Sequence, residues 1–228
     1  STTTGADGND NNVIEYCEID ASGAAAVGIG SAGTTDKSNS GNIIRNNNIY
    51  DFYLGDASTT ATYGINIAVH NTAWTITGNS IYQKTPRAYT TSGNAFHYGL
   101  YVSSATGAGG DFVITDNYIG GSAPMAGGSP WTVTGGLGRP VGLYTSFGTA
   151  SPSSVQNNTI TNFDITTDFI TNGSSAFIGY WHNAGSVNAG TVAGNTIGSS
   201  TAAGAIVVKY QGAAVGALTV GVNIVTAA

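Results

Sequence analysis

The sequence predicts an all-β solenoid, a parallel β-helix of about six to seven coils that forms one repeat domain over residues 1–228. Three observations indicate this fold. A short motif with a central Asn recurs along the chain, a second series of strands recurs between its copies, and helix signals are nearly absent. Repeats with a drifting period of this length are typical of solenoids whose loops vary in length.

The recurring motif is a branched aliphatic residue, two further residues, Asn, one residue and a closing Ile or Val. Seven segments fit it, with Cys17 in the Asn position of the first: Ile14–Ile19, Ile44–Ile49, Ile76–Ile81, Ile114–Ile119, Val155–Ile160, Val192–Ile197 and Val220–Val225. Their closing residues are 28 to 41 residues apart. We therefore expect one motif in each coil.

Each motif is expected to bend sharply at its Asn. The two aliphatic residues cannot both point inward from one straight strand, because side chains alternate along a strand. Asn suits such a bend, since it tolerates left-handed backbone angles and bonds to neighbouring backbone groups. Stacked coils would align these side chains in an inner hydrogen-bonded ladder. The residues predicted to form it are Asn47, Asn79, Asn117, Asn158, Asn195 and Asn223, with Cys17 at its end.

The second series of strands contains a Gly in each copy. Its members are Val27–Ile29, Tyr63–Ile67, Tyr98–Val102, Val141–Thr145 and Ile178–His182, with Ala205–Val208 as a weaker sixth. Two strand types in fixed alternation fit coils of two or three strands each. The Pro-containing span 120–140 interrupts the series. We expect it to protrude as a loop, with Trp131–Val133 as a candidate short strand.

The composition limits the classes of partner. Charged residues are 8% of the chain and Gly is 34 of 228, against usual shares of about a quarter and about 7%. Lys and Arg together number 6 and the net charge is −6, which argues against nucleic acid as a partner. No apolar run reaches the roughly 18 residues of a membrane helix. A surface rich in Ser, Thr, Asn and Gly fits an extracellular protein.

Several phrases resemble a known kind of protein. They are Asp7–Asn12, Trp74–Asn79, Asn117–Pro124, Ser154–Ile160 and Thr191–Gly198. They resemble the right-handed parallel β-helix repeats of very large secreted surface proteins of gliding and biofilm-forming bacteria, of the type IX secretion kind. The resemblance covers almost the whole chain. It implies a structural or adhesive surface module, within a longer chain or in a fibre, whose partners are neighbouring coils or copies of itself.

A candidate ligand site lies on the outer face of the Gly-containing strands. If the residues after Gly point inward, the next residues form an outward column that reads Gly30, Asn66, Tyr101, Tyr144, Trp181 and Val207. Coils about 4.8 Å apart would bring the three aromatic side chains together, and the Gly column is expected to leave one flank of the rings open. Such rings suit sugar rings, so polysaccharide is one expected partner. Purely structural stacking of the rings is the alternative.

Catalysis and metal binding have weaker support in the sequence. The carboxylates in or beside turns are Asp51, Asp56, Asp111, Asp116, Asp164 and Asp168, and they form no column. We expect solvated turn residues rather than a catalytic pair, so a pectate-lyase-like lyase or hydrolase rests on fold analogy alone. His70, His97 and His182 have different offsets from their local Gly and are not expected to converge. No cofactor is expected, although Asp7–Asn11 is similar to a calcium-binding turn.

Overall fold

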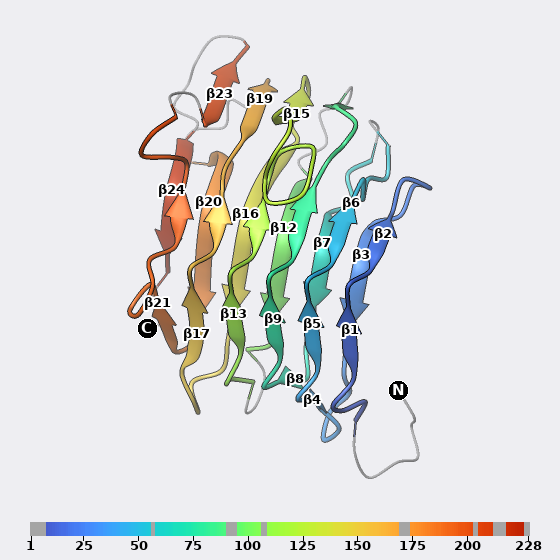
Figure 1. Cartoon of the computed structure of the whole chain (residues 1–228), viewed down its shortest axis with the longest axis vertical. Helices are drawn as coiled ribbons and strands as arrows, with labels where there is room; N and C mark the ends of the chain where they lie inside the picture. The colour runs from blue at the N-terminus through green and yellow to red at the C-terminus, as the bar shows by residue number, and fades with distance from the viewer. Residues whose placement is uncertain are drawn as a thin grey trace.

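The computed structural model describes residues 8–55, 58–89, 95–105, 109–168, 174–202, 205–211 and 218–225. The regular structure in these ranges consists of strands, with no helix, so the expected all-β class is confirmed. Within the same ranges, no helix is long and apolar enough to cross a membrane. The strands form four multi-stranded parallel sheets and one short parallel pair (Figure 1).

The first sheet contains the aliphatic residue that opens each of the first five predicted motifs, and the second sheet contains the residue that closes each of the first six. The strands of the first sheet are β1 (Val13–Glu15), β5 (Ile43–Arg45), β9 (Thr75–Thr77), β13 (Val113–Thr115), β17 (Ser153–Gln156) and β21 (Val187–Ala189). The strands of the second are β2 (Glu18–Asp20), β6 (Asn48–Tyr50), β10 (Ser80–Tyr82), β14 (Tyr118–Ile119), β18 (Thr159–Ile160) and β22 (Thr196–Ile197). Two residues separate the two strands in each of the first five copies, and six residues separate them in the last.

The Gly-containing strands form the fourth sheet, and a third sheet precedes it along the chain. The strands of the third sheet are β11 (Arg87–Ala88), β15 (Trp131–Thr134), β19 (Phe163–Thr167) and β23 (Ile206–Tyr210). The strands of the fourth are β3 (Val27–Ser31), β7 (Thr62–Ile67), β12 (Phe96–Ser103), β16 (Arg139–Ser146), β20 (Ser175–Ala184) and β24 (Leu218–Ile224). The short pair is β4 (Asn39–Ser40) with β8 (Asn71–Thr72).

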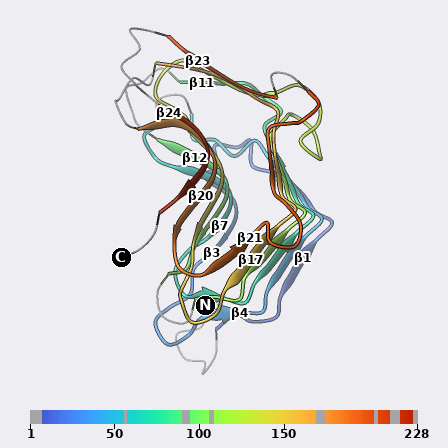
Figure 2. The ribbon, with the colours of Figure 1, turned by 90° about the vertical axis from the view of Figure 1, so that its left-hand side faces the viewer.

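The order first, second and fourth sheet recurs six times along the described chain, with a strand of the third sheet inserted from the third repeat onward. We call each recurrence a repeat: β1–β4, β5–β8, β9–β12, β13–β16, β17–β20 and β21–β24. Every repeat adds one strand to the first, second and fourth sheets beside the strand of the repeat before it (Figure 1). Viewed along this stacking direction, the strands of a sheet lie one behind another and the sheets surround a common interior (Figure 2).

The interior is one hydrophobic cluster with contributions from all four sheets. Ile76 of the first sheet, Ile81 of the second, Val133 of the third and Leu100 of the fourth are each at most 1% exposed. Each strand supplies inward residues at period two, and parallel pairing aligns them with their equivalents in the next repeat. The stacking of repeats therefore builds a continuous core, which no single repeat has alone.

Two assignments from the sequence are wrong, and a third is only partly right. Within the span 120–140, the predicted short strand is present as β15, which is paired on both sides, with Trp131 only 2% exposed. The span is not a loop throughout, because this strand is part of the third sheet and β16 begins at Arg139. The segment predicted as a sixth Gly-containing strand, Ala205–Val208, lies largely in β23 of the third sheet. Val192 was expected to open the sixth motif, in the position equivalent to Val155. It is 92% exposed, and Ala189 is the residue that pairs with Val155.

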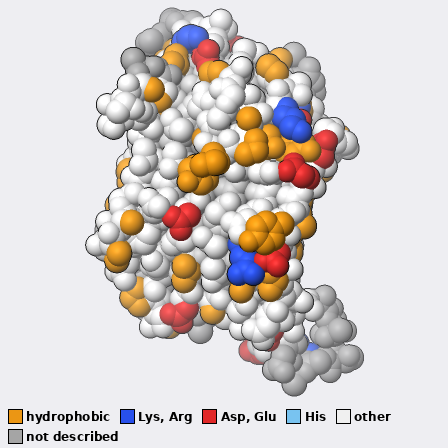
Figure 3. All heavy atoms as spheres, in the orientation of Figure 1, with side chains coloured by type: hydrophobic (Ala, Val, Ile, Leu, Met, Phe, Trp, Pro, Cys, Tyr) orange, Lys and Arg blue, Asp and Glu red, His pale blue; other side chains and the backbone are white. Residues whose placement is uncertain are grey.

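Charged side chains are scattered over the surface. Figure 3 shows one face on which a few acidic and basic groups lie among mostly uncharged atoms. The ion pairs found among the described residues are Glu15 with Arg45, Asp51 with Arg87, and Asp164 with Lys209. The Asp51–Arg87 pair is the buried one, with side chains 8% and 12% exposed.

Candidate functional site

The four residues predicted to bind carbohydrate lie in one row on the fourth sheet. Asn66 of β7 pairs with Tyr101 of β12, Tyr101 pairs with Tyr144 of β16, and Tyr144 pairs with Trp181 of β20. The rings of Tyr101 and Tyr144 are stacked, with centroids 4.5 Å apart and planes 11° apart. The Trp181 ring meets Tyr144 edge-on at 5.1 Å. Parallel pairing thus brings together every member of the proposed site.

A second group of rings, which the sequence analysis missed, lies against this row. Tyr63 and Tyr98 are stacked with centroids 5.3 Å apart, and Phe96 stacks on Tyr98 at 5.5 Å. Tyr98 also contacts Tyr101 at 4.8 Å, although these residues are three apart on one strand. We call the six residues of both groups the aromatic surface: Tyr63, Phe96, Tyr98, Tyr101, Tyr144 and Trp181. A sequence signal for the second group exists, since Tyr directly precedes Gly in two repeats.

The aromatic surface is partly closed by its own rings. Tyr98 and Tyr144 are 7% and 9% exposed, whereas Phe96, Tyr101 and Trp181 are half-buried. Burial raises the pKa of Tyr98 and Tyr144 above the ordinary value, so their hydroxyls remain neutral at physiological pH. The surface is therefore a largely neutral one that combines ring faces with hydroxyl groups.

Two polar atoms in the row have no hydrogen-bond partner among the described residues. They are Oδ1 of Asn66 and Nε1 of Trp181, and both atoms are shielded from solvent. Because a buried polar atom without a partner costs roughly 1–3 kcal/mol, such atoms call for an explanation. One is an acceptor and the other a donor, and they lie at opposite ends of the Tyr101–Tyr144 pair.

The cation nearest these rings belongs to Arg139. Its guanidinium lies over the Phe96 ring, 4.0 Å from the centroid, and its Nε donates to the carbonyl oxygen of Ser175 (2.6 Å). Burial lowers the pKa of this guanidinium, which nevertheless remains charged. Arg139 thus holds Phe96 in place by a cation–π contact.

We expected from the sequence that the Gly column would leave one flank of the rings open, and this expectation is wrong. A Cβ on Gly99 would lie 2.5 Å from Cγ2 of Ile119 and 2.8 Å from the carbonyl oxygen of Gly142. The equivalent Cβ on Gly64 would meet Ile81 at 2.6 Å. The glycines therefore face the interior, where they let the second sheet pack closely against the fourth.

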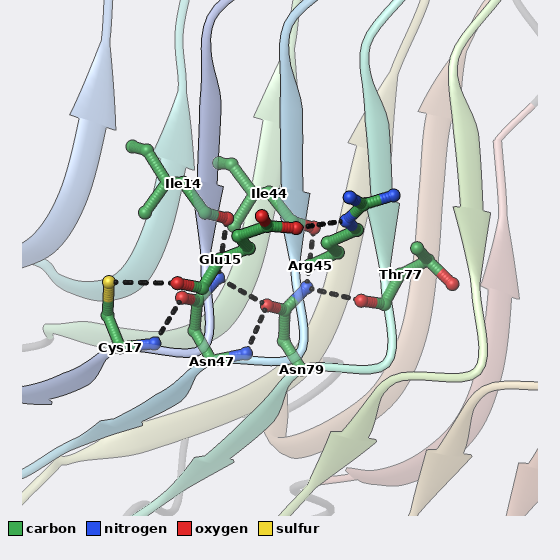
Figure 4. A network of polar contacts seen from close by, with 8 residues as sticks. All are labelled: Ile14, Glu15, Cys17, Ile44, Arg45, Asn47, Thr77 and Asn79. Carbon is green, nitrogen blue, oxygen red and sulfur yellow. Dashed lines mark hydrogen bonds and ion pairs between the residues drawn. The ribbon is translucent and has the colours of Figure 1, made fainter.

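The predicted ladder forms as a row of buried amides at the bend between the first and second sheets (Figure 4). Nδ2 of Asn47 donates to Oδ1 of Asn79 (3.0 Å), and the backbone N of Asn47 donates to the same oxygen (3.1 Å). Nδ2 of Asn79 also donates to the carbonyl oxygen of Ile44 (2.9 Å). The same pattern continues from Asn79 to Asn117, Asn158 and Asn195. We call these five side chains the Asn row.

The two ends of the Asn row differ from each other. At the N-terminal end, the backbone N of Cys17 donates to Oδ1 of Asn47 (3.0 Å), and its thiol is exposed, so Cys17 ends the row as expected. At the other end, Asn223 is not in the row. It lies in β24 of the fourth sheet and pairs with Trp181. Asn223 thus takes the place that was assigned to Val207, which lies in β23.

In the first five bends, the left-handed residue is the one before the row position rather than the row residue itself. The residues with positive φ at this place are Tyr16, Asn46, Gly78, Asp116 and Asn157, with φ between 52° and 67°. The row Asn is then free to point inward, where its amide satisfies buried backbone groups. This local geometry explains why the bend keeps the same length while its left-handed residue varies.

The predicted turn carboxylates do not converge. Asp51 is buried and accepts from the guanidinium of Arg87 (2.8 Å) and from the backbone N of Lys84 (2.9 Å), so it fixes a loop and is not a solvated turn residue. Asp164 binds Lys209, and Asp168 accepts from the backbone N of Gly136. Asp56 lies outside the described residues. No cluster of three or more His, Cys, Asp or Glu suited to a metal occurs in the described part of the chain.

The His residues also occupy separate places. His97 is 4% exposed, its Nδ1 contacts Oγ1 of Thr62 (2.9 Å), and burial lowers its pKa to about 3. His182 contacts Oγ1 of Thr145 through Nδ1 (3.0 Å) and the carbonyl oxygen of Gly185 through Nε2 (3.1 Å). Both rings are neutral structural groups at neutral pH. The proposed calcium turn begins at Asp7, which lies outside the described residues.

Both ends of the stacked repeats have open strand edges. Within the described residues, no strand pairs with the outer edges of β1, β2 and β3, or with those of β21, β22 and β24. Cavities of about 350 Å³ and 460 Å³ open at the first and last repeats, the first beside Asn12, Asn39 and Asn42. Such edges are templates for further parallel strands.

The sheets and the Asn row define the chain as an all-β repeat protein with parallel sheets. Comparison with protein-family models, curated proteins and solved structures found no match to this chain.

Proposed function

We propose that the chain is a right-handed parallel β-helix that acts as a structural, adhesive module at the cell surface. The observation that carries this proposal is the pair of open ends. Strand edges and cavities at both ends make the stack extendable in either direction. The function of such a module depends on its length and stiffness. Each added repeat lengthens it by one strand spacing of about 4.8 Å.

The sparse charge supports the same proposal. Only 8% of residues are charged, so much of the polar outer surface consists of side-chain amides and hydroxyls that bind water without strong fields. Extracellular, surface-exposed placement rests on this composition and on the resemblance of the repeat phrases to secreted surface proteins. In this proposal the module holds other groups away from the cell or binds neighbouring material laterally.

Surface placement is tested by labelling intact source cells with an antibody raised against the purified chain. Immunogold particles on unpermeabilised cells, along fibres or the outer surface, are the expected result. Labelling that requires permeabilised cells would refute the proposal. An antibody against a known internal protein of the same cells controls for leakage.

A second candidate function is carbohydrate binding at the aromatic surface, and the unpaired atoms of Asn66 and Trp181 favour it. In this proposal the Asn66 and Trp181 side chains turn outward on binding, so that one hydroxyl of a sugar chain donates to Oδ1, a different hydroxyl accepts from Nε1, and Tyr101 offers a ring face. Tyr144 is largely covered, so the accessible ring faces of the row belong to Tyr101 and Trp181.

Glycan-array binding of the wild type and two variants tests this function. Trp181→Ala should abolish retention of the bound glycan, because it removes both a ring and the unpaired donor. Tyr118→Ala removes a half-buried ring from the second sheet and should leave retention unchanged. Equal binding by all three proteins would reject the aromatic surface as the site.

A further inference from the structure

Each glycine of the column except the last, Gly221, contacts an Ile side chain of the next repeat. Five glycines would place a Cβ within 2.5–2.6 Å of Cγ2 of an Ile in the next repeat: Gly28, Gly64, Gly99, Gly142 and Gly179, against Ile49, Ile81, Ile119, Ile160 and Ile197. Gly221 continues this column in β24, yet no atom of the described residues lies within 4 Å of its Cβ position. The C-terminal edge thus has a receptor for one more Ile.

The N-terminal repeat carries the matching side chain. Ile19 of β2 is in register with Ile49 of β6, so it is the member of the Ile column that no glycine among the described residues contacts in this way. Gly28 lies in the same repeat as Ile19. In the other repeats, the carbonyl oxygen of each column glycine lies close to the Cβ position of the glycine in the preceding repeat, and Gly28 carries the equivalent oxygen. One edge therefore presents the Ile, and the other presents the open glycine.

The fourth-sheet strands at the two ends have compatible registers. Val27 and Ile29 of β3 occupy the positions in that sheet that Val220 and Val222 occupy in β24. The inward side chains at the ends are exposed to an unusual degree for aliphatic residues, with Val222 at 53%, Ile224 at 62% and Ile14 at 37%. Burial of such residues against one another would favour association by roughly 25 cal/mol per Å².

Charge favours one orientation of the two copies. The N-terminal repeat carries Asp10, Glu15, Glu18 and Asp20, whereas residues 169–228 contain no carboxylate side chain and one cation, Lys209. Two N-terminal edges would place these acids against each other. A C-terminal edge receives them without like-charge repulsion.

We infer that the C-terminal edge of this chain binds the N-terminal edge of a second copy, head to tail, with the second copy's Ile19 seated on Gly221. The inference rests on the proposed β-helical module and names its partner. Such contacts do not close, so copies add into filaments. The joint is weaker than the stacking within a chain, because Cys17 offers no amide oxygen to Asn195 and the first two repeats have no described strand to pair with β23.

Sedimentation velocity across a wide range of protein concentration, in reducing buffer, tests the inference, with negative-stain microscopy of the concentrated sample. The wild type should associate reversibly into linear species. Gly221→Val fills the Ile receptor, and Val222→Asp places a carboxylate in the joint, so each should weaken association by about tenfold or more, equivalent to about 1.4 kcal/mol. Val113→Asp, on the outer face of the first sheet in a middle repeat, is the matched control and should associate like the wild type.

Circular dichroism first establishes that each variant is folded, which is expected because both end residues are open in the single chain. A wild type that stays monomeric at every concentration overturns the inference. So does association that both end variants leave unchanged. Neither result affects the surface-labelling experiment, since a monomeric chain that labels on intact cells would still be a structural surface module.

Discussion

Oδ1 of Asn117 accepts two hydrogen bonds from Asn79, one from Nδ2 at 3.0 Å and one from the backbone N at 3.1 Å. Asn117 in turn donates to the carbonyl oxygen of Ile76 at 2.9 Å. Each amide of the Asn row thus satisfies buried groups of both neighbouring repeats. The row ties the bends together at a point where the chain leaves one sheet and enters the next.

Asn117→Ala should strongly destabilise the fold. It leaves two buried donors of Asn79 and the carbonyl oxygen of Ile76 without these partners, at roughly 1–3 kcal/mol for each group. We expect a loss of about 3 kcal/mol or more in the free energy of unfolding, measured by urea denaturation. Asn48→Ala is the control, because Asn48 is the first residue of β6, directly after a row position, and bonds outward to Glu18. A loss below about 1 kcal/mol for Asn117→Ala would contradict a structural role for the row.

Cys17→Asn should extend the row by one member. The backbone N of Cys17 already donates to Oδ1 of Asn47, so an amide at this position has the geometry to donate through Nδ2 as well. Because the position is exposed, the expected gain in the free energy of unfolding is about 0.5–1 kcal/mol. Cys17→Ala separates this gain from simple loss of the thiol. Equal stability of the Asn and Ala variants would show that the row does not extend to this bend.

Gly99→Ala and Gly221→Ala form a matched pair. The added methyl group at Gly99 collides with Ile119 and with the carbonyl oxygen of Gly142, whereas at Gly221 it enters open space. Overpacking of this kind costs about 1–3 kcal/mol. Thermal denaturation of dilute protein should show a lower Tm for Gly99→Ala and little change for Gly221→Ala. Similar Tm values for both would mean that the two sheets are packed less closely than in the structure.

His97 should make stability fall in acid. Burial lowers its pKa in the fold from 6.5 to about 3, so between these values the unfolded chain binds a proton that the folded chain does not. The stability is fully present above about pH 6.5 and is lost as the pH falls toward 3, at up to about 1.4 kcal/mol per pH unit. Urea denaturation at pH 7 and pH 5 measures the slope.

His97→Asn removes this titration and keeps a polar group near Oγ1 of Thr62. The variant should be less stable at pH 7 and should lose less stability between pH 7 and pH 5 than the wild type. His182, whose pKa burial also lowers, contributes a similar slope to both proteins. Identical pH slopes would exclude His97 as the source.

The sequence predicted the bend at the Asn row well because its spacing is short and constant. It failed at Asn223, since Val220–Val225 fits the bend motif by spacing and also fits the Gly-containing strand. The decisive similarity is between Val220-Gly221-Val222-Asn223-Ile224 and Tyr63-Gly64-Ile65-Asn66-Ile67. Only strand register distinguishes the two assignments, and register depends on contacts between residues far apart in the chain.

The third sheet left little trace in the sequence. Its strands share no motif, and two of them, Arg87–Ala88 and Trp131–Thr134, are short. Half of the aromatic surface was missed for a different reason. An ideal strand would place Tyr98 and Tyr101 on opposite faces, but the parallel pairing skips Gly99 and both rings emerge on one side.

The Asn row also has a direction. In every bond between two members of the row, Nδ2 of one Asn donates to Oδ1 of the Asn in the following repeat, so the amide carbonyls point toward the N-terminal repeat. Aligned amide dipoles add, and hydrogen bonds in such a series polarise one another. The molecule therefore contains an axial electric dipole within its interior, negative toward Cys17 and positive toward Asn195. Its orientation would be copied wherever another repeat joined the series.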